Sequence, residues 1–241
     1  MSKLFLTILA SLFLCACADK YAVTYAMDPP GDLDIRNKVT VTVRDLVDRR
    51  PSQERVGPAD PLDGAFYSED GVLEEPLSES ITRLLQLELS NAGLDVVDSA
   101  NYVPGTERSV RVAGEIYHAY VMGTPESTVS DDNLWKRMRY TVRVAVRVDM
   151  IDTLAEKRVM ARKYEYKDSF VIRHAMQDFE AVKEGKDKNY LEAGDAYCMQ
   201  LFNDAVKKVL VQARRDIIVQ MSPDIGNMPA SIEGLEMTDE L

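Results

Sequence analysis

The sequence is poor in the residue types that most often carry catalysis or bind metals. Its 241 residues include only three cysteines and two histidines. It has no HExxH motif, no metal-binding cysteine pair, no EF-hand loop, no P-loop and no Gly-x-Ser-x-Gly elbow. We therefore predict that the chain is not an enzyme and has no cofactor and no metal site.

The two histidines do not form a recognisable site. Glu115 and His118 are spaced as Glu-x-x-His, but they lie in a predicted strand, where residues three apart point to opposite faces. They could not ligate one metal without a β-bulge, so we expect His118 to be a packed or edge residue. His174 follows Arg173 in a polar connection, and we expect it to face solvent.

Positive charge is also in short supply. Lys and Arg number 29 against 40 Asp and Glu, which gives a formal net charge of −11. Nucleic-acid binding needs a concentrated positive face, and broad attachment to anionic lipid needs basic clusters. We predict no nucleic-acid partner, and acidic charge spread along the chain is typical of a soluble surface.

The N-terminus lacks an apolar run of the roughly 20 residues that a membrane-spanning helix needs. The uncharged run Leu4–Ala16 follows Lys3 and has the length of an export-signal core. It closes on the motif LCAC, which resembles the lipobox of bacterial lipoproteins and ends at Cys17. Cys15 is a poor alternative because a large leucine directly precedes it. Residues 1–16 are thus predicted to be a lipoprotein signal peptide.

The lipobox resemblance implies that the Cys17 thiol takes a diacylglycerol and that the peptide bond before it is then cut. Two or three acyl chains anchor a protein stably, since each buried methylene contributes about 0.8 kcal/mol. Ala18, rather than aspartate, follows Cys17, which favours the outer membrane and its periplasmic side; Asp19 leaves the inner membrane open. The alternatives are an ordinary secreted protein and an uncleaved signal anchor.

Cleavage would leave Cys17 and Cys198, so no internal disulfide is expected. Cys198 falls within an apolar helical stripe and is predicted to be a small buried hydrophobe. The alternative is a reactive thiol, which would need a cationic and exposed setting.

Composition divides the rest of the chain into three parts. Residues 17–37 are predicted to be a tether, residues 38–222 a single domain, and residues 223–241 an acidic disordered tail. Within the domain, residues 48–71 form a long polar loop rich in Pro, Gly, Asp and Arg. Such a loop is either a contact surface or disordered.

Hydrophobic periodicity predicts seven main elements. Apolar residues alternate in strands from Lys38 and over 140–150, and they recur at helical spacing over 76–92 and 191–220. In the strand over 108–122, one side is expected to carry Val110, Val112, Ile116 and Tyr120, with His118 in register. Further strands are expected over 94–97 and 158–170. The order is β-α-β-β-β-β-α, and the fold class is α+β: a mostly antiparallel sheet with two amphipathic helices packed on one face.

One row of arginines is a candidate contact. Alternation places Arg139, Arg143 and Arg147 on the polar face of a single strand. The row is either a solvated face paired with acidic neighbours or a docking patch for an anionic partner, such as a polymer or an acidic protein surface.

Three segments carry a resemblance to a known family. Val39–Asp48 forms a first strand ending in Asp-Arg-Arg, Pro76–Val97 contains a Leu-rich helix and turn (LSNAGLDVV), and Ala205–Ile217 forms a closing helix. Behind a lipobox, this order resembles the YajG-like lipoproteins and, more loosely, the α/β domain of LpoB and CsgG. The resemblance spans Lys38–Ser222 and implies no catalytic residues.

Taken together, these features predict a lipid-anchored, periplasm-facing component of the bacterial cell envelope. We expect it to bind or assemble with an envelope protein or polymer, with the membrane contacted through the N-terminal lipid. The alternatives are a carrier of a hydrophobic ligand, which would need a roomy apolar cavity, and an envelope hydrolase, which would need convergent polar groups in a pocket.

Overall fold

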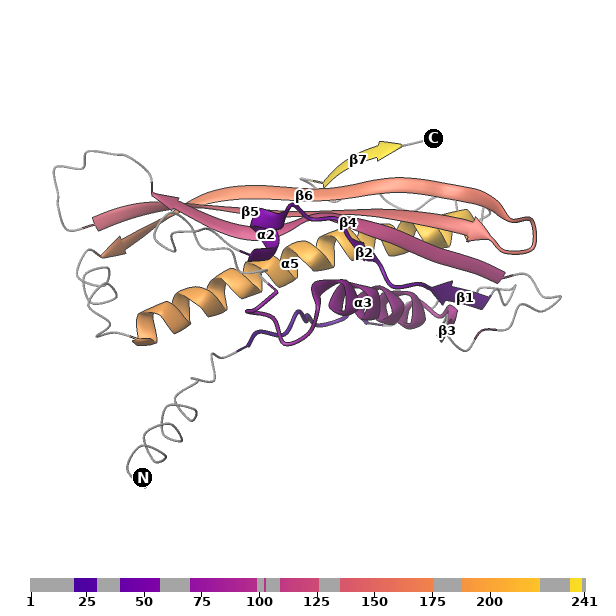
Figure 1. The fold of residues 1–241 in the computed structure, drawn as a ribbon, viewed down its shortest axis with the longest axis horizontal. Helices are drawn as coiled ribbons and strands as arrows, with labels where there is room; N and C mark the ends of the chain where they lie inside the picture. Colours follow the sequence, from indigo (N-terminus) through magenta and orange to yellow (C-terminus); the bar gives the residue numbers. More distant parts are fainter. Residues whose placement is uncertain are drawn as a thin grey trace, which may run out of the picture.

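The fold is a single mixed β-sheet with two long helices on one face, as Figure 1 shows. The structure is a computed structural model, and it describes residues 20–29, 40–56, 70–98, 102, 109–125, 135–175, 188–221 and 235–239. The main elements follow the order β-α-β-β-β-β-α. The predicted α+β class and element order are therefore confirmed.

The strands and helices have the following bounds. The strands are β1 (Thr40–Val43), β2 (Val47–Asp48), β3 (Asp95–Asp98), β4 (Ser109–Pro125), β5 (Trp135–Asp152), β6 (Lys157–Ala175) and β7 (Leu235–Asp239). The helices are α2 (Ser52–Val56), α3 (Leu77–Asn91) and α5 (Lys188–Met221).

The sheet has the strand order β3-β1-β4-β5-β6-β7, with β2 also paired to β4. Strand β1 runs parallel to both β3 and β4, because α3 carries the chain back to the same end of the sheet before β3 begins. Strands β4 to β7 are antiparallel to one another. The long strands β4, β5 and β6 form most of the surface on which the molecule is built.

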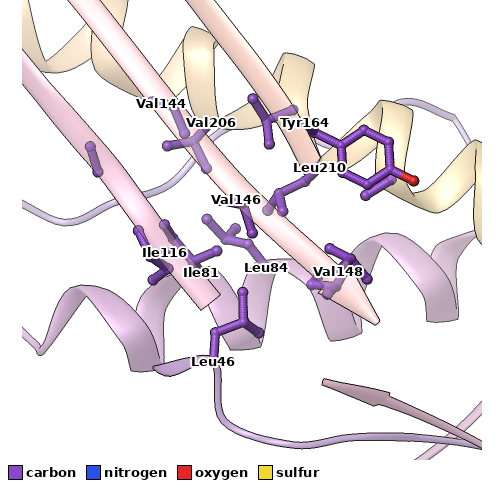
Figure 2. Packing of buried hydrophobic residues seen from close by; sticks show 14 of the residues in the cluster. Leu46, Ile81, Leu84, Ile116, Val144, Val146, Val148, Tyr164, Val206 and Leu210 are labelled. Carbon is purple, nitrogen blue, oxygen red and sulfur yellow. The ribbon is translucent and has the colours of Figure 1, made fainter. Parts of the chain in front are cut away.

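The core lies between the sheet and helices α3 and α5. Strand β5 alternates strictly, so that Val144, Val146 and Val148 point toward the helices and are fully buried. Burying an apolar side chain of this size stabilises the fold by roughly 1.5–3 kcal/mol. Figure 2 shows this layer, with labelled side chains Leu46, Ile81, Leu84, Ile116, Val144, Val146, Val148, Tyr164, Val206 and Leu210.

Helix α3 ends where the sequence predicts. Gly93 has a left-handed backbone (φ 89°), which stops the helix at little steric cost. The Gly93 amide donates to the Ser90 carbonyl at 2.9 Å and the Leu94 amide to the Leu89 carbonyl at 3.2 Å. These bonds satisfy carbonyls at the helix end and turn the chain directly into β3.

A buried ion pair joins the two long helices. Glu88 of α3 has no exposed side-chain surface, and its Oε2 lies 2.6 Å from Nη1 of Arg214 in α5. The phenol of Tyr25 lies beside this pair, and burial followed by the Glu88 charge raises the pKa of Tyr25. Breaking a buried pair of this kind by removing one partner typically costs about 3–5 kcal/mol.

Strand β4 departs from simple alternation. Its register with β5 shifts between Ile116 and His118, so that Tyr117 is an extra residue in a β-bulge. Ala119 and Val121 then point into the core, whereas His118 and Tyr120 point away from it. The expectation that Tyr120 and His118 share a side with Ile116 was wrong, because one inserted residue reverses every later side chain.

Parts of the predicted tether, loop and tail are ordered elements. In the tether, Val23 is buried in the core and Tyr21 bridges to Leu73. The loop over 48–71 contains Asp48 of β2 and all of α2, while residues 57–69 lie outside the described chain. In the expected disordered tail, β7 pairs with β6; its leucine and methionine alternate with polar residues at the period of a strand.

No helix in the described part of the chain is both long enough and apolar enough to cross a membrane.

The core analysis predicts a contrast along α3. Leu85→Ala should lower the free energy of unfolding by about 2–5 kcal/mol, because Leu85 is fully buried and its removal leaves a cavity. Leu87→Ala is the matched control, since Leu87 is 45% exposed, and it should change stability by less than about 1 kcal/mol. Urea unfolding followed by circular dichroism measures both, and equal losses would contradict the assigned helix face.

Candidate functional site

The candidate contacts lie on the face of β4, β5 and β6 that points away from α3 and α5, which we call the outer face. Arg139, Arg143 and Arg147 all lie on it, because they alternate with Met138, Val142 and the buried valines of β5. The structure therefore places the predicted arginine row on one face. None of these positions belongs to the core.

Two of the three arginines have acidic partners close by. Arg143 Nε donates to Glu165 Oε1 at 2.6 Å, and Lys163 Nζ lies 3.2 Å from the other oxygen of Glu165. Arg147 Nη2 lies 3.3 Å from Asp149 Oδ1. Arg139 is exposed at the far end of the row. Arg143 and Arg147 are thus paired with acidic neighbours, and Arg139 is the most exposed of the three.

Glu165 shows how strong the local pairing is. Burial alone would raise the pKa of its carboxyl group, but hydrogen bonds from Arg143 and Lys163 and their positive charges lower it further than burial raises it. The pKa of Glu165 therefore lies below its usual range. The carboxylate is held ionised by two cations from adjacent strands.

Even so, the outer face has an excess of positive charge. Its described positions on β4–β6 carry seven basic and three acidic side chains, although the whole chain is strongly acidic. The basic residues are Arg111, Arg139, Arg143, Arg147, Arg158, Lys163 and Lys167; the acidic ones are Glu115, Asp149 and Glu165.

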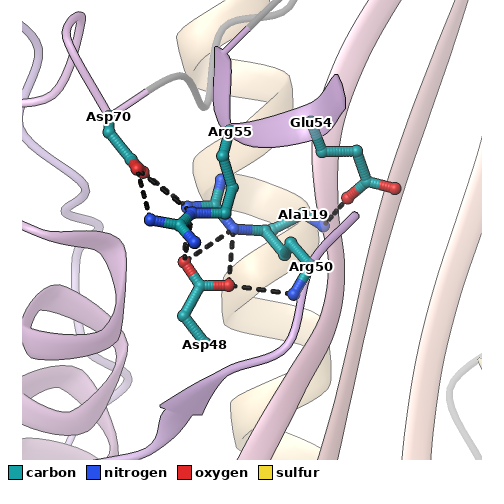
Figure 3. Close-up of polar contacts among 6 residues, drawn as sticks. All are labelled: Asp48, Arg50, Glu54, Arg55, Asp70 and Ala119. Carbon is teal, nitrogen blue, oxygen red and sulfur yellow. Dashed lines mark hydrogen bonds and ion pairs between the residues drawn. The ribbon is translucent and has the colours of Figure 1, made fainter. Parts of the chain in front are cut away.

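The bulge in β4 creates a second polar cluster at the strand edge. Glu54 of α2 is buried, and its Oε1 lies 2.6 Å from His118 Nδ1. Its Oε2 accepts the Ala119 amide at 3.1 Å, as Figure 3 shows. Strand β2 ends beside Ile116, so Glu54 satisfies an amide that the departing strand leaves unpaired.

Glu115 and His118 do lie on the same face, because the extra residue in the bulge reverses the orientation of the side chains that follow it. The two side chains nevertheless have different partners. Glu115 accepts from Tyr117 at 2.5 Å and from Arg49 at 3.4 Å, while His118 contacts Glu54. Within the described residues, no group of three or more His, Cys, Asp or Glu side chains is arranged to hold a metal ion.

The base of the 48–71 segment is clamped by a buried arginine. The Arg50 side chain is fully buried, and its Nη2 lies 2.8 Å from Asp48 Oδ2 and 2.9 Å from Asp70 Oδ1 (Figure 3). Arg55 Nη2 adds a contact to Asp70 at 3.1 Å. The segment therefore leaves and rejoins the domain at one fixed point, which local sequence patterns do not reveal.

The remaining sequence candidates are two cysteines and a histidine. Cys198 is buried and has a free thiol, which agrees with its predicted packing role. Cys17, the predicted lipid site, lies outside the described residues, as does the side chain of His174. The contacts of Glu54 with His118 and Ala119, and of Arg50 with Asp70, were missed because these partners are distant in sequence and no spacing signals them.

The low pKa of Glu165 predicts a pH-dependent role for Arg143. A lowered pKa contributes stability above the unfolded value of about 4.3, and this is lost as the pH falls through the folded value. Arg143→Gln should therefore lower the unfolding free energy by about 1 kcal/mol at about pH 7 and by less at about pH 3.

Lys167→Gln is the matched control for this experiment. It removes one exposed positive charge from the strand position opposite Arg143. Urea unfolding at both pH values should show a small effect of this change that does not depend on pH. Equal losses for Arg143→Gln at both pH values would show that Arg143 does not act through the Glu165 carboxylate.

Comparison with known proteins finds similarity at the level of the fold. No protein-family model and no curated protein matches the chain. Among solved structures, protein XCC0632 from Xanthomonas campestris, of family DUF330, is 8% identical, with a TM-score of 0.49 over 87% of this chain and 100% of that one. A homolog of neuraminyllactose-binding hemagglutinin from Helicobacter pylori is 13% identical, with a TM-score of 0.39 over 86% and 95%. Lipoprotein GNA1162 from Neisseria meningitidis is 12% identical, with a TM-score of 0.19 over 57% and 83%.

Proposed function

We propose that the chain is a lipid-anchored component of the bacterial cell envelope that faces the periplasm from the outer membrane and binds or assembles with an anionic partner without catalysing a reaction. The observation that carries this proposal is the basic outer face of an otherwise acidic chain. An acidic surface of an envelope protein is the partner that this face suits best.

The charge segregation has a physical consequence for binding. Most of the chain repels an anionic surface, because its net charge is −11. The outer face attracts such a surface, and complementary potentials of this kind steer encounter and select orientation. Arg139 and Lys167 are exposed there, so both are accessible to a partner.

The N-terminal segment supports an orientation for this face. Residues 20–29 run along the helix layer: Asp28 Oδ1 lies 2.8 Å from Lys207 Nζ of α5, and the Asp28 carbonyl accepts from Asn91 of α3 at 2.7 Å. A lipid on Cys17 would therefore emerge on the helix side of the sheet. The outer face would then point away from the anchoring membrane, toward partners in the periplasm.

The anchor has a direct test with a matched cysteine. Cys17→Ser should abolish lipidation and signal cleavage at this site, and the protein should lose its stable attachment to the outer-membrane fraction. Cys198→Ser is the control. Cys198 is buried in the core, so this substitution should leave membrane attachment unchanged. Cell fractionation and mass spectrometry of the N-terminus measure both variants. A Cys17→Ser protein that stayed membrane-bound with unchanged processing would refute the anchor.

The partner is tested by crosslinking the anchored protein in cells and identifying captured proteins by mass spectrometry. The double variant Arg139→Glu and Lys167→Glu reverses charge on the outer face at exposed positions. It should reduce recovery of a stoichiometric acidic partner at least about tenfold, because like charges now face each other.

Arg83→Glu with Lys20→Glu is the matched control, since both residues are exposed and neither lies on β4–β6. This variant should retain the partner at the wild-type level. Recovery of the protein alone in every case would contradict an assembly role and direct attention to a bound polymer or lipid.

A further inference from the structure

A hollow opens on the outer face near the turn between β5 and β6. Its volume is about 730 Å³, within the range of roughly 300–1,000 Å³ that is usual for small-molecule sites. Strands β1, β4, β5 and β6 all contribute to it. The lining residues are Thr42, Arg44, Tyr102, Arg111, Ile151, Thr153, Glu156 and Arg158.

The floor of the hollow is one cross-strand row. Thr42 pairs with Arg111, Arg111 with Ile151, and Ile151 with Arg158. The backbones of the two arginines thus lie two strand spacings apart, about 10 Å across the sheet, with Ile151 between them. Both guanidinium groups can close over a ligand that rests on the apolar surface of Ile151.

A second β-bulge puts Arg158 into this row. The register between β5 and β6 shifts from Met150 opposite Met160 to Ile151 opposite Arg158, so Val159 is the extra residue. Without the insertion, Arg158 would have the same orientation as Met160, which is buried in the core. The bulge is a local irregularity whose effect is to add a guanidinium group to the hollow.

One wall is held in place by hydroxyl groups. Tyr102 Oη donates to Ser109 Oγ at 2.5 Å, and Ser109 Oγ contacts Thr153 Oγ1. Thr153 Oγ1 in turn donates to the Ser109 carbonyl at 2.9 Å. These bonds fix the loop residue Tyr102 and the turn residue Thr153 against β4, so the hollow has a defined wall.

The hollow is positively charged. Three guanidinium groups, from Arg44, Arg111 and Arg158, line it against the single carboxylate of Glu156. Within the described part of the chain, neither Arg44 nor Arg111 has a carboxylate within 4 Å, and Arg158 is 3.7 Å from Asp149. Among the described residues, the guanidinium groups of Arg44 and Arg111 therefore have no carboxylate partner.

We propose that this hollow binds the phosphate group of a small phosphorylated ligand. Guanidinium groups bind phosphate oxygens in bidentate pairs, and the tetrahedral oxygens of a phosphate group can accept from several arginines in different directions, which a planar carboxylate cannot. The volume leaves room for an organic substituent over Ile151. The hollow shares Arg111 and Arg158 with the basic outer face, but twelve residues of β5, about 40 Å, separate Ile151 from Arg139, where the partner contact is tested.

The test is isothermal titration calorimetry of the purified full-length chain with two probes at millimolar concentration. Inorganic phosphate represents a free phosphate, and glycerophosphoglycerol, a soluble phosphodiester, represents a phospholipid headgroup. Wild-type protein should bind at least one probe. The double variant Arg44→Gln and Arg111→Gln should bind it at least about tenfold more weakly.

Arg139→Gln with Lys167→Gln is the matched control, because it removes the same charge from the other end of the outer face. It should bind like wild type, and urea unfolding should show that both double variants are folded. Tighter binding of inorganic phosphate would identify a free phosphate or monoester as the ligand type, and tighter binding of the diester would identify a headgroup.

Two results would overturn the site: no binding of either probe, or equal binding by the Arg44 and Arg111 variant. Neither result affects the partner surface, which is tested by crosslinking with different residues. Failure of the wild-type protein to capture any partner, together with retained phosphate binding, would in turn refute the proposed function alone.

Discussion

The structure depends on burying one face of three long antiparallel strands. Strand β5 presents a continuous apolar row to α3 and α5, and each valine in that row is completely enclosed. Because side chains of a strand alternate, the same constraint directs every intervening residue to the other face. The position of the helices therefore decides which residues of β4–β6 are available to anything outside the molecule.

The two β-bulges interrupt the regular alternation of side chains between the buried face and the outer face. Each inserts one residue, and each changes what the outer face contains beyond it. The bulge at Tyr117 brings His118 to the outer face, where it meets Glu54 of a short helix. The bulge at Val159 brings Arg158 beside Ile151. Polar groups that regular alternation would have buried or separated are thus gathered at two places on one surface.

The sequence was a good guide to elements whose signal is local. The valine alternation of β5 and the leucine spacing of α3, closed by Gly93, predict both elements and the face that each buries. The arginine row on one face also follows from alternation alone. These predictions succeed because hydrophobic period and helix-ending glycine act over a few residues.

The parts that escaped prediction depend on contacts distant in sequence. Arg50 is buried between Asp48 and Asp70, and Asp70 lies twenty residues after Arg50 in the sequence. Glu54 reaches an amide and a histidine more than sixty residues away. A β-bulge is equally hard to recognise in the sequence, because one extra residue in a strand gives no distinctive pattern until the partner strand is known. The ordering of residues 20–29 and of β7 likewise depends on surfaces that form only on folding.

The packing of the N-terminal segment would limit how far an N-terminally lipidated domain could extend from a membrane. Tyr21 is already bonded to the domain through the Val72 carbonyl. If Cys17 carries the lipid, only four residues connect the bilayer surface to that point, and a fully extended chain of this length spans at most about 14 Å. The domain would then diffuse in two dimensions as part of the membrane surface, and its partners would have to come to that surface to meet it.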